Sequence, residues 1–572
     1  MKTVTRKTRR FLPLNLEINA WEDIAPFMQE LEDRIITNAA GLEDFIFDLS
    51  EVEAVLEESG AWRYINMTRH TDNQEFVDKY TKFVQEVHPK VAPIADRLNK
   101  KIEAADFKER LPEFILYKNF FRNLSKDIEL YREENIPVFT EISTLSKDFG
   151  AISGAMSIEW EGKELTLQQA SKLLKSTDRE ARKKAYDLIQ NRRFQDREKL
   201  DELFNTLVQK RQTVAENAGF KNFRDYKFKA MGRFDYDVAD CKKFHESVKE
   251  HILPLVEELH RKRKTALGLD VLKPWDLSVD PSGKEALNPF EGERELIDKS
   301  IKVFEKIDSY FAECLSIMDN MGHLDLESRK GKAPGGYNYP LYEIGVPFIF
   351  MNAAGTHSDV ITMMHEGGHA VHSFLTKDFK VTGFKGFPSE VAELASMSTE
   401  LISMVAGWEE FYPDKEDLKR AHADQLERVI DVLPWVATID KFQHWIYENP
   451  NHSVEERDRA WMEIFMEFSS SEIDYSDSEE FLRKSWQKQM HLFEVPFYYI
   501  EYGFAQLGAI AVWKNYCENP EQTLEQFKKA LALGYTRTIP EIYKTAGIKF
   551  DFSPQYIKSL ADFVKEKSVE LG

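Results

Sequence analysis

Two histidines four residues apart, His365 and His369, enclose a glutamate at position 366 in the pattern His-Glu-x-x-His. On a helix, side chains four residues apart lie one turn apart on the same face, so both imidazoles can reach one metal ion. Glu366 then lies beside that ion, where a carboxylate can take a proton from a zinc-bound water. The motif predicts a hydrolytic zinc centre; the alternative is two histidines that only pack within a helix.

The motif needs a helix, and the preceding residues predict where that helix begins. Thr356 and Asp359 form a capping-box pattern directly before the apolar run 360–364. Gly367 and Gly368 oppose the prediction, because each glycine costs a helix interior about 1 kcal/mol. Two adjacent glycines are easier to accept if another backbone passes close to this face of the helix.

A catalytic zinc needs a third protein ligand and an open coordination position. A second predicted helix follows Pro388 and carries acids at positions 390, 393 and 400. Glu393 and Glu400 share a helical face, whereas Glu390 lies in the first turn, where an acid complements the helix dipole. Spacing alone leaves all three open and favours Glu393. An acid that is not a ligand can still orient a ligand imidazole from behind.

Four stretches together resemble the thimet oligopeptidase/oligoendopeptidase F family of zinc metallopeptidases. They are Gly331-Lys-Ala-Pro-Gly-Gly-Tyr, Gly355-Thr-x-x-Asp-Val, His365-Glu-x-Gly-His and Ala392-Glu-Leu-Ala-Ser-Met-Ser-Thr-Glu. The resemblance covers at least residues 200–565 and extends upstream through residues 157–182. It implies that His365, His369 and Glu393 hold one Zn²⁺ per chain. Glu400 then matches the family's second acid, placed behind the ligands.

The resemblance also gives meaning to an aromatic segment that contains His491, Tyr498, Tyr499 and Tyr502. In the family, a histidine and one or two tyrosines of such a segment face the scissile carbonyl. A phenol suits this role because it donates a hydrogen bond to the developing oxyanion without carrying a charge. Tyr498 and Tyr499 diverge by about 100° on a helix, and Tyr502 shares a face with either. His491 and Tyr502 are preferred, then Tyr499; the alternative is a stripe of core aromatics.

Several other residues near the motif are candidates for contacts with substrate or with the ligands. His372 lies seven residues after His365, although a buried histidine with no functional role fits equally. Asp359 lies at the start of the zinc helix, and Tyr337 and Tyr339 lie on a glycine-rich loop. The apolar run 347–354 predicts a strand, either an edge strand that pairs with an extended peptide or a core strand.

The rest of the chain predicts a mainly α fold. Apolar residues recur at spacings of three and four nearly throughout, whereas residues 156–166 alternate around Glu161-Gly162 and predict a β-hairpin. We expect a helical N-terminal region, 1–200, that contains this hairpin. A catalytic region, 201–572, follows and carries a small β-sheet next to the zinc helix. The resemblance implies two lobes around a deep channel that admits short peptides.

The composition excludes several classes of protein. The chain of 572 residues carries a net charge of −21, which argues against nucleic acid as a partner because phosphate binding needs a basic patch. No run of 18 apolar residues occurs, so a membrane span is not expected. Three widely separated cysteines, at 241, 314 and 517, are not a disulfide framework and favour a reducing, cytoplasmic setting.

These observations predict a zinc oligoendopeptidase that cuts internal bonds of short unstructured peptides. Glu366 would activate the zinc-bound water, and zinc with a Tyr or His would stabilise the oxyanion. One alternative is a zinc exopeptidase, a carboxypeptidase or dipeptidase of similar helical fold. Another is a non-catalytic helical zinc-binding scaffold, although zinc binding alone does not need Glu366. The sequence makes no prediction of oligomeric state.

Overall fold

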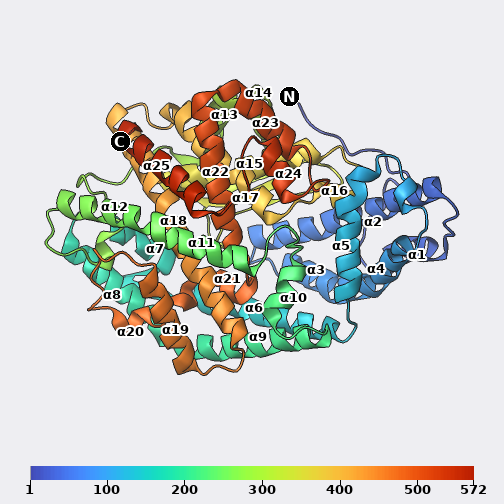
Figure 1. Ribbon diagram of the computed structural model, residues 1–572, viewed down its shortest axis with the longest axis horizontal. Coiled ribbons are helices and arrows are strands. Elements are labelled where there is room, and N and C mark those ends of the chain that lie inside the picture. Colours follow the sequence, from blue (N-terminus) through green and yellow to red (C-terminus); the bar gives the residue numbers. More distant parts are fainter. Residues whose placement is uncertain (1, 572) are drawn as a thin grey trace. The chain divides into compact units, whose positions relative to one another are not determined.

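The computed structural model describes residues 2–571, so the outermost residues of the two predicted regions, 1 and 572, lie outside it. It confirms a mainly helical protein (Figure 1). Contacts divide the chain into two units, each made of three separated segments. Unit 1 comprises residues up to Tyr131, Asn288–Leu418 and Gly508–Phe550; unit 2 comprises Arg132–Leu287, Lys419–Leu507 and the residues from Asp551 onward. Helices α18 (Lys415–Glu448) and α22 (Tyr499–Glu518) contain residues of both.

Unit 1 begins with a group of helices that bury one apolar face each. Along α2, the buried side chains include Leu42, Phe45, Leu49 and Val52, which recur at spacings of three and four. The helices of this unit are α1 (Trp21–Asp33), α2 (Ala39–Arg69), α3 (Gln74–Lys82), α4 (His88–Glu103), α5 (Phe114–Leu130), α13 (Gly292–Ile307), α14 (Ser309–Met321), α15 (His357–Thr376), α16 (Thr382–Lys385), α17 (Ser389–Gly407), α23 (Pro520–Leu531) and α24 (Ile539–Thr545).

A three-stranded sheet of unit 1 lies against the helix that carries the His-Glu-x-x-His motif. Its order is β3 (Leu324–Glu327), β5 (Phe348–Ala353), β4 (Tyr337–Tyr339), with β3 parallel and β4 antiparallel to β5. The apolar strand predicted before the motif is therefore real. The interpretation as an edge strand is wrong, because β5 is central and buried on both faces, which suits its continuous apolar sequence. Strands β3 and β4 are the two edge strands of this sheet.

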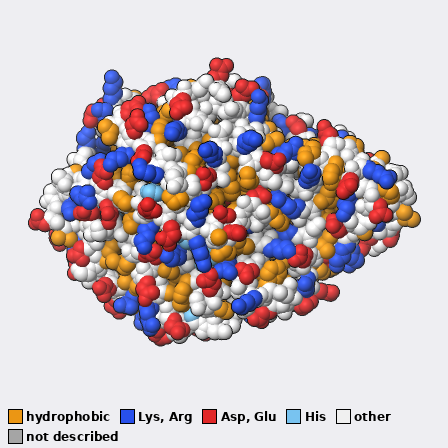
Figure 2. Space-filling view, viewed as in Figure 1, with side chains coloured by type: hydrophobic (Ala, Val, Ile, Leu, Met, Phe, Trp, Pro, Cys, Tyr) orange, Lys and Arg blue, Asp and Glu red, His pale blue; other side chains and the backbone are white. Residues whose placement is uncertain are grey.

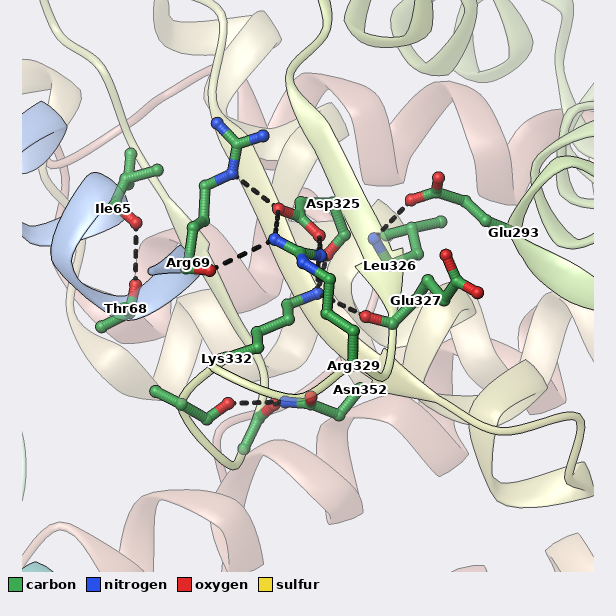
Figure 3. A network of polar contacts seen from close by, with 12 residues as sticks. Ile65, Thr68, Arg69, Glu293, Asp325, Leu326, Glu327, Arg329, Lys332 and Asn352 are labelled. Carbon is green, nitrogen blue, oxygen red and sulfur yellow. Dashed lines mark hydrogen bonds and ion pairs between the residues drawn. The ribbon is translucent and has the colours of Figure 1, made fainter. Parts of the chain in front are cut away.

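Asp325 of β3 anchors the loop between β3 and β4, as Figure 3 shows. Its carboxylate accepts hydrogen bonds from Arg69 Nε at 2.6 Å, Lys332 Nζ at 2.7 Å and Arg329 Nη2 at 2.8 Å. Lys332 also donates to the backbone oxygens of Asp325 and Glu327, both at 2.9 Å. Burial alone would raise the pKa of Asp325, but the three cations outweigh it and hold that pKa well below its ordinary value. The loop that leads to β4 is thereby fixed to the sheet.

Unit 2 is helical apart from the predicted hairpin, which is confirmed as β1 (Ser157–Trp160) paired antiparallel with β2 (Lys163–Thr166). Glu161 and Gly162 form its two-residue turn with φ of 51° and 77°, the conformation that favours glycine in tight hairpins.

The helices of unit 2 are α6 (Asn135–Gly154), α7 (Leu167–Ser171), α8 (Arg179–Gln195), α9 (Arg197–Asn217), α10 (Phe223–Ala230), α11 (Val238–His251), α12 (Leu253–Ala266), α19 (Val454–Glu467), α20 (Glu479–Leu482), α21 (Met490–Glu494) and α25 (Pro554–Leu571).

Charged side chains of both signs lie on the surface, as expected for a chain with 77 lysines and arginines and 98 acidic residues. On the face seen in Figure 2, lysines and arginines are interspersed with the acidic residues. None of the helices within residues 2–571 is both long and apolar enough to cross a membrane.

Replacing Asp325 with alanine should lower the free energy of unfolding of unit 1 by about 3–5 kcal/mol, because the buried ammonium group of Lys332 loses its counter-charge. The Lys332 side chain is fully buried, whereas Arg69 and Arg329 are about one-third exposed and can turn to solvent. Urea unfolding of the variant would measure the loss. The matched control, Arg329→Ala, leaves Asp325 paired and should cost about 1 kcal/mol or less. Equal losses in the two variants would contradict this account.

Candidate metal centre

Helix α15 begins where the sequence predicted, directly after Thr356. The Asp359 carboxylate accepts hydrogen bonds from the backbone N–H groups of Thr356 at 2.8 Å and Ala354 at 2.9 Å, and from the Thr356 hydroxyl at 2.8 Å. These bonds satisfy donors at the helix start, where an acidic side chain also complements the dipole. In the structure Asp359 therefore fixes the start of the helix that carries the motif.

The two glycines of the motif lie where neighbouring elements come very close. A methyl group on Gly368 would lie 2.7 Å from Ser396 Cα and 2.8 Å from the Ala395 carbonyl oxygen, both in the backbone of α17. A methyl group on Gly367 would lie 2.4 Å from the Phe304 ring on α13. Another backbone therefore passes close to the motif helix at Gly368. This contact brings α17 near enough for its acids to meet the histidines of α15.

Three side chains of these two helices converge at one point. Nε2 of His365 lies 3.3 Å from Oε2 of Glu393, and Nε2 of His369 lies 3.9 Å from the same oxygen. The ligand atoms of all three lie within 4.8 Å of one another, and the two imidazole planes are 87° apart. Two imidazole nitrogens and one carboxylate oxygen form a donor set typical of catalytic zinc.

Two side chains of α17 orient these donors from behind. Glu400 Oε1 lies 2.7 Å from Nδ1 of His365, which places a proton on Nδ1 and leaves the Nε2 lone pair directed at the cluster. The Ser396 hydroxyl donates to Oε2 of Glu393 at 3.2 Å. Burial lowers the pKa of His365, but Glu393 and Glu400 raise it by more, so the net shift is upward. Acids on both sides of this imidazole make the position favourable for a cation.

Glu366 is a buried acid whose carboxylate is only partly satisfied. The residue is 7 % exposed, and its Oε2 has no hydrogen-bond partner among residues 2–571. Burial, assisted by Glu393 and Glu400 and opposed by His365, raises the pKa of Glu366 to about 7. A carboxyl group with such a pKa can both accept and release a proton near neutral pH.

The residues present fit a zinc ion. Burial lowers the pKa of His369 to about 4, so its imidazole is neutral, the form that binds metal. The site also contains the unpartnered Glu366 oxygen beside the three convergent donors. This donor set, with a second carboxylate available for proton transfer, is the arrangement that hydrolytic zinc sites require.

The other candidates in unit 1 have different surroundings. His372 is fully buried and stacks on Phe387 at 3.7 Å, and burial lowers its pKa to about 3, so it is a neutral core residue. The Tyr337 hydroxyl is hydrogen-bonded to Thr68 Oγ1 at 2.7 Å. The pKa of Tyr339 is raised to about 12 by burial. Contacts of either tyrosine with substrate stay a prediction.

The predicted aromatic segment lies in unit 2, where its members cluster. The His491 ring centroid lies 4.9 Å from that of Tyr499, 5.8 Å from Tyr502 and 6.2 Å from Tyr498. The Tyr502 hydroxyl lies 3.5 Å from His491 Nε2, and Gln489 Nε2 lies 2.7 Å from His491 Nδ1. The Tyr502 hydroxyl therefore lies within reach of the predicted histidine.

Sequence reasoning missed Asn338. Its side-chain amide donates to the Glu366 backbone oxygen at 3.2 Å and so ties β4 to α15 beside the base candidate. In β4, alternate side chains face opposite sides, so Asn338 points away from Tyr337 and Tyr339; the sequence predicted a loop here and gave no such alternation.

Comparisons with known proteins agree over nearly the whole chain. The model of peptidase family M3 matches residues 172–562, and that of the peptidase M3 N-terminal domain matches residues 11–131. Among curated proteins, oligopeptidase PepF of Bacillus subtilis (strain 168) is 21 % identical over 97 % of this chain and 84 % of its own. Group B oligopeptidase PepB of Streptococcus agalactiae serotype III (strain NEM316) is 21 % identical over 94 % of this chain and 92 % of its own.

Two solved structures share the fold. PZ peptidase A, determined with an inhibitor, has a TM-score of 0.91 and 25 % identity, with 98 % of this chain and 99 % of that chain covered. Oligoendopeptidase-F from Enterococcus faecium has a TM-score of 0.65 and 15 % identity, with 96 % of this chain and 97 % of that chain covered. The fold of this chain is therefore shared with these two proteins.

Replacing Gly368 with alanine should destabilise the protein by about 1–3 kcal/mol, because the new methyl group meets a backbone that cannot turn away. Displacement of α17 should also weaken zinc binding through Glu393. Thermal unfolding and zinc titration would measure both effects. Gly150→Ala is the control, since that exposed glycine of α6 has open space around it and alanine should be neutral or slightly stabilising. Similar behaviour of the two variants would argue against the close contact.

Replacing Glu400 with alanine should raise the zinc dissociation constant about 10–100-fold, because His365 loses the acceptor that fixes its tautomer. Competition titration against a chromogenic chelator would measure it. Glu400→Gln retains an oxygen that can accept from Nδ1 and should remain closer to the parent. An alanine variant that binds zinc as tightly as the parent would show that Glu400 does not orient the ligand.

Proposed function

Because the chain belongs to peptidase family M3, a family of zinc-dependent oligopeptidases, we propose that it is an endopeptidase that cuts internal bonds of short unstructured peptides. The observation that carries this proposal is the convergence of His365, His369 and Glu393 beside the buried, unpartnered carboxylate oxygen of Glu366. The three ligands would hold one Zn²⁺. When bound, zinc lowers the pKa of a coordinated water and polarises the scissile carbonyl.

Glu366 is the proposed general base and acid. Its Oε2 accepts the proton of the attacking water and later delivers that proton to the leaving amine. Asn338 holds the backbone of Glu366 in place through its 3.2 Å hydrogen bond. Glu400 and Ser396 keep the ligand donors aimed while the carbonyl carbon changes geometry.

The assignment of oxyanion stabilisation to His491 and Tyr502 rests on the family resemblance of their segment. Support comes from the contact between the Tyr502 hydroxyl and His491 within unit 2. A phenol that is protonated is neutral and can donate its O–H to an oxyanion. Tyr499 is the second candidate; burial raises its pKa to about 12, so its phenol is protonated as well.

The proposal predicts chelator-sensitive internal cleavage of unstructured peptides, with rates that fall as peptides lengthen or fold. Mass spectrometry of products from peptides of graded length would show where the cuts occur. Stepwise loss of residues from one end would instead establish the exopeptidase alternative. Absence of cleavage by zinc-loaded protein would favour the non-catalytic scaffold.

Two variants in the same assay separate metal binding from chemistry. Glu366→Gln should retain zinc, measured by elemental analysis, while kcat falls about 10²–10⁴-fold. Tyr502→Phe should lower kcat about 10²-fold or more with little change in KM, whereas Tyr498→Phe should have a smaller effect. Near-normal turnover by Glu366→Gln would eliminate that residue as the base.

A further inference from the structure

A second group of metal-binding side chains comes together in unit 2, far along the chain from the His-Glu-x-x-His motif. One ligand atom each of Cys241, Asp440 and His444 lies within 4.8 Å of the other two. The exposed fractions of the three residues are 0 %, 0 % and 3 %. His245 joins the group through its Nε2, which lies 2.9 Å from Asp440 Oδ2.

Two helices, α11 and α18, both labelled in Figure 1, supply these four residues in matching pairs. Cys241 and His245 lie on α11, and Asp440 and His444 lie on the part of α18 that belongs to unit 2. Each pair is spaced by four residues, so each helix presents two donors one turn apart on one face. The hydrogen bond between His245 and Asp440 shows that the two faces meet. Helical proteins build metal sites in this way, from inward-facing side chains of adjacent helices.

Hydrogen bonding within the chain leaves this group incomplete. Across residues 2–571, neither ring nitrogen of His444 has a hydrogen-bond partner, and Asp440 Oδ1 has none either. His444 Nε2 lies 3.3 Å from Asp440 Oδ2, a longer contact than the 2.9 Å between His245 Nε2 and the same oxygen. Buried polar atoms without partners are costly, so their concentration at one point indicates that a ligand satisfies them.

The surroundings are apolar. Phe497 and Phe228 lie beside His444, with ring centroids 5.4 Å and 5.7 Å away. Two cations of the same region are already paired, Arg233 with Glu501 and Lys441 with Glu467. The Asp440 carboxylate lies 2.9 Å from His245 Nε2 and 3.3 Å from His444 Nε2, and a buried charge of this kind needs a counter-charge.

We propose that Cys241, His245, Asp440 and His444 bind a second zinc ion with a structural role, which fastens α11 to α18. One thiolate and one carboxylate neutralise the charge of Zn²⁺, and two neutral imidazoles complete four ligands. Binding displaces the Cys241 thiol proton to solvent, so charge and protons balance. Sulfur and nitrogen donors select zinc over magnesium or calcium. Four protein ligands leave no open position for water, which is the pattern of structural zinc sites.

Three of the four donors already converge, and the fourth must move closer. At zinc bond lengths of about 2.0–2.3 Å, tetrahedral donors lie about 3.3–3.8 Å from one another. The ligand atoms of Cys241, Asp440 and His444 lie within 4.8 Å of one another, whereas His245 reaches this group through its 2.9 Å contact with Asp440 Oδ2. For His245 to bind through Nε2, its imidazole must carry its proton on Nδ1, a change of tautomer that releases no further proton.

Metal content of the full-length protein tests the proposal. Elemental analysis after purification with zinc and removal of loose metal should give two zinc ions per wild-type chain. The variant His365→Ala/His369→Ala should retain one, and the further changes Cys241→Ser and His444→Gln should remove it. His260→Gln, a buried histidine of α12, is the control for His444→Gln and should leave the count unchanged. One zinc per wild-type chain and none in the His365→Ala/His369→Ala variant would overturn the proposal, whatever the peptidase assays show.

Cobalt substitution gives a readout that needs no variant. Co²⁺ bound to a thiolate produces a sulfur-to-cobalt charge-transfer band, and the centre in unit 1 has no cysteine ligand. The wild-type protein loaded with Co²⁺ should therefore show this band through Cys241. Cys241→Ser should abolish it, whereas Cys314→Ser, at another buried cysteine, should retain it. Absence of the band from the wild type, or its survival in Cys241→Ser, would contradict the assignment.

Discussion

The contact between Gly368 and the backbone of α17 determines the geometry on which the metal centre depends. With hydrogen alone as its side chain, Gly368 lets Ala395 and Ser396 approach to a distance that a methyl group would block. Glu393 comes from one side of this contact and His369 from the other, so the separation of their ligand atoms follows from the separation of the helices. A conformational cost of about 1 kcal/mol per glycine is accepted for that approach. The glycines make α15 less stable as an isolated helix, but they allow the ligand atoms of α15 and α17 to come together.

Both buried centres, and the Asp325 network, follow one electrostatic rule. A carboxylate removed from water persists only where cations or several donors surround it. Asp325 has three cationic side chains, and Asp440 has two imidazoles within 3.3 Å. Glu366 and Asp440 each have one oxygen without a partner among the described residues, but only the pKa of Glu366 is raised by its surroundings. A buried acid with a raised pKa is suited to proton transfer, whereas an acid that nearby imidazoles or cations keep ionised is suited to holding structure.

Local pattern predicted the features that depend on neighbours in sequence. The start of α15 at Thr356, the hairpin turn at Glu161-Gly162 and the mainly helical fold are all confirmed. The edge-strand interpretation of residues 347–354 failed because strand order depends on β3 and β4, which the sequence does not pair. Asn338 and the cluster at Cys241 were missed for the same reason. Cys241-x-x-x-His245 and Asp440-x-x-x-His444 are visible as motifs, but some 200 residues separate them and only the fold brings them together.

The interleaved path of the chain has a consequence for synthesis and for fragmentation. Unit 1 takes its last segment from residues 508–550, and unit 2 takes its last segment from residues after 550. A ribosome that has completed residues 1–418 has therefore synthesised the motif helix and α17 but not the segment that contains Gly508, which packs against Leu394. Neither unit corresponds to a contiguous stretch of the gene. Truncation from the C-terminus removes parts of both units, so a nascent chain reaches its native contacts only when nearly all of it has emerged.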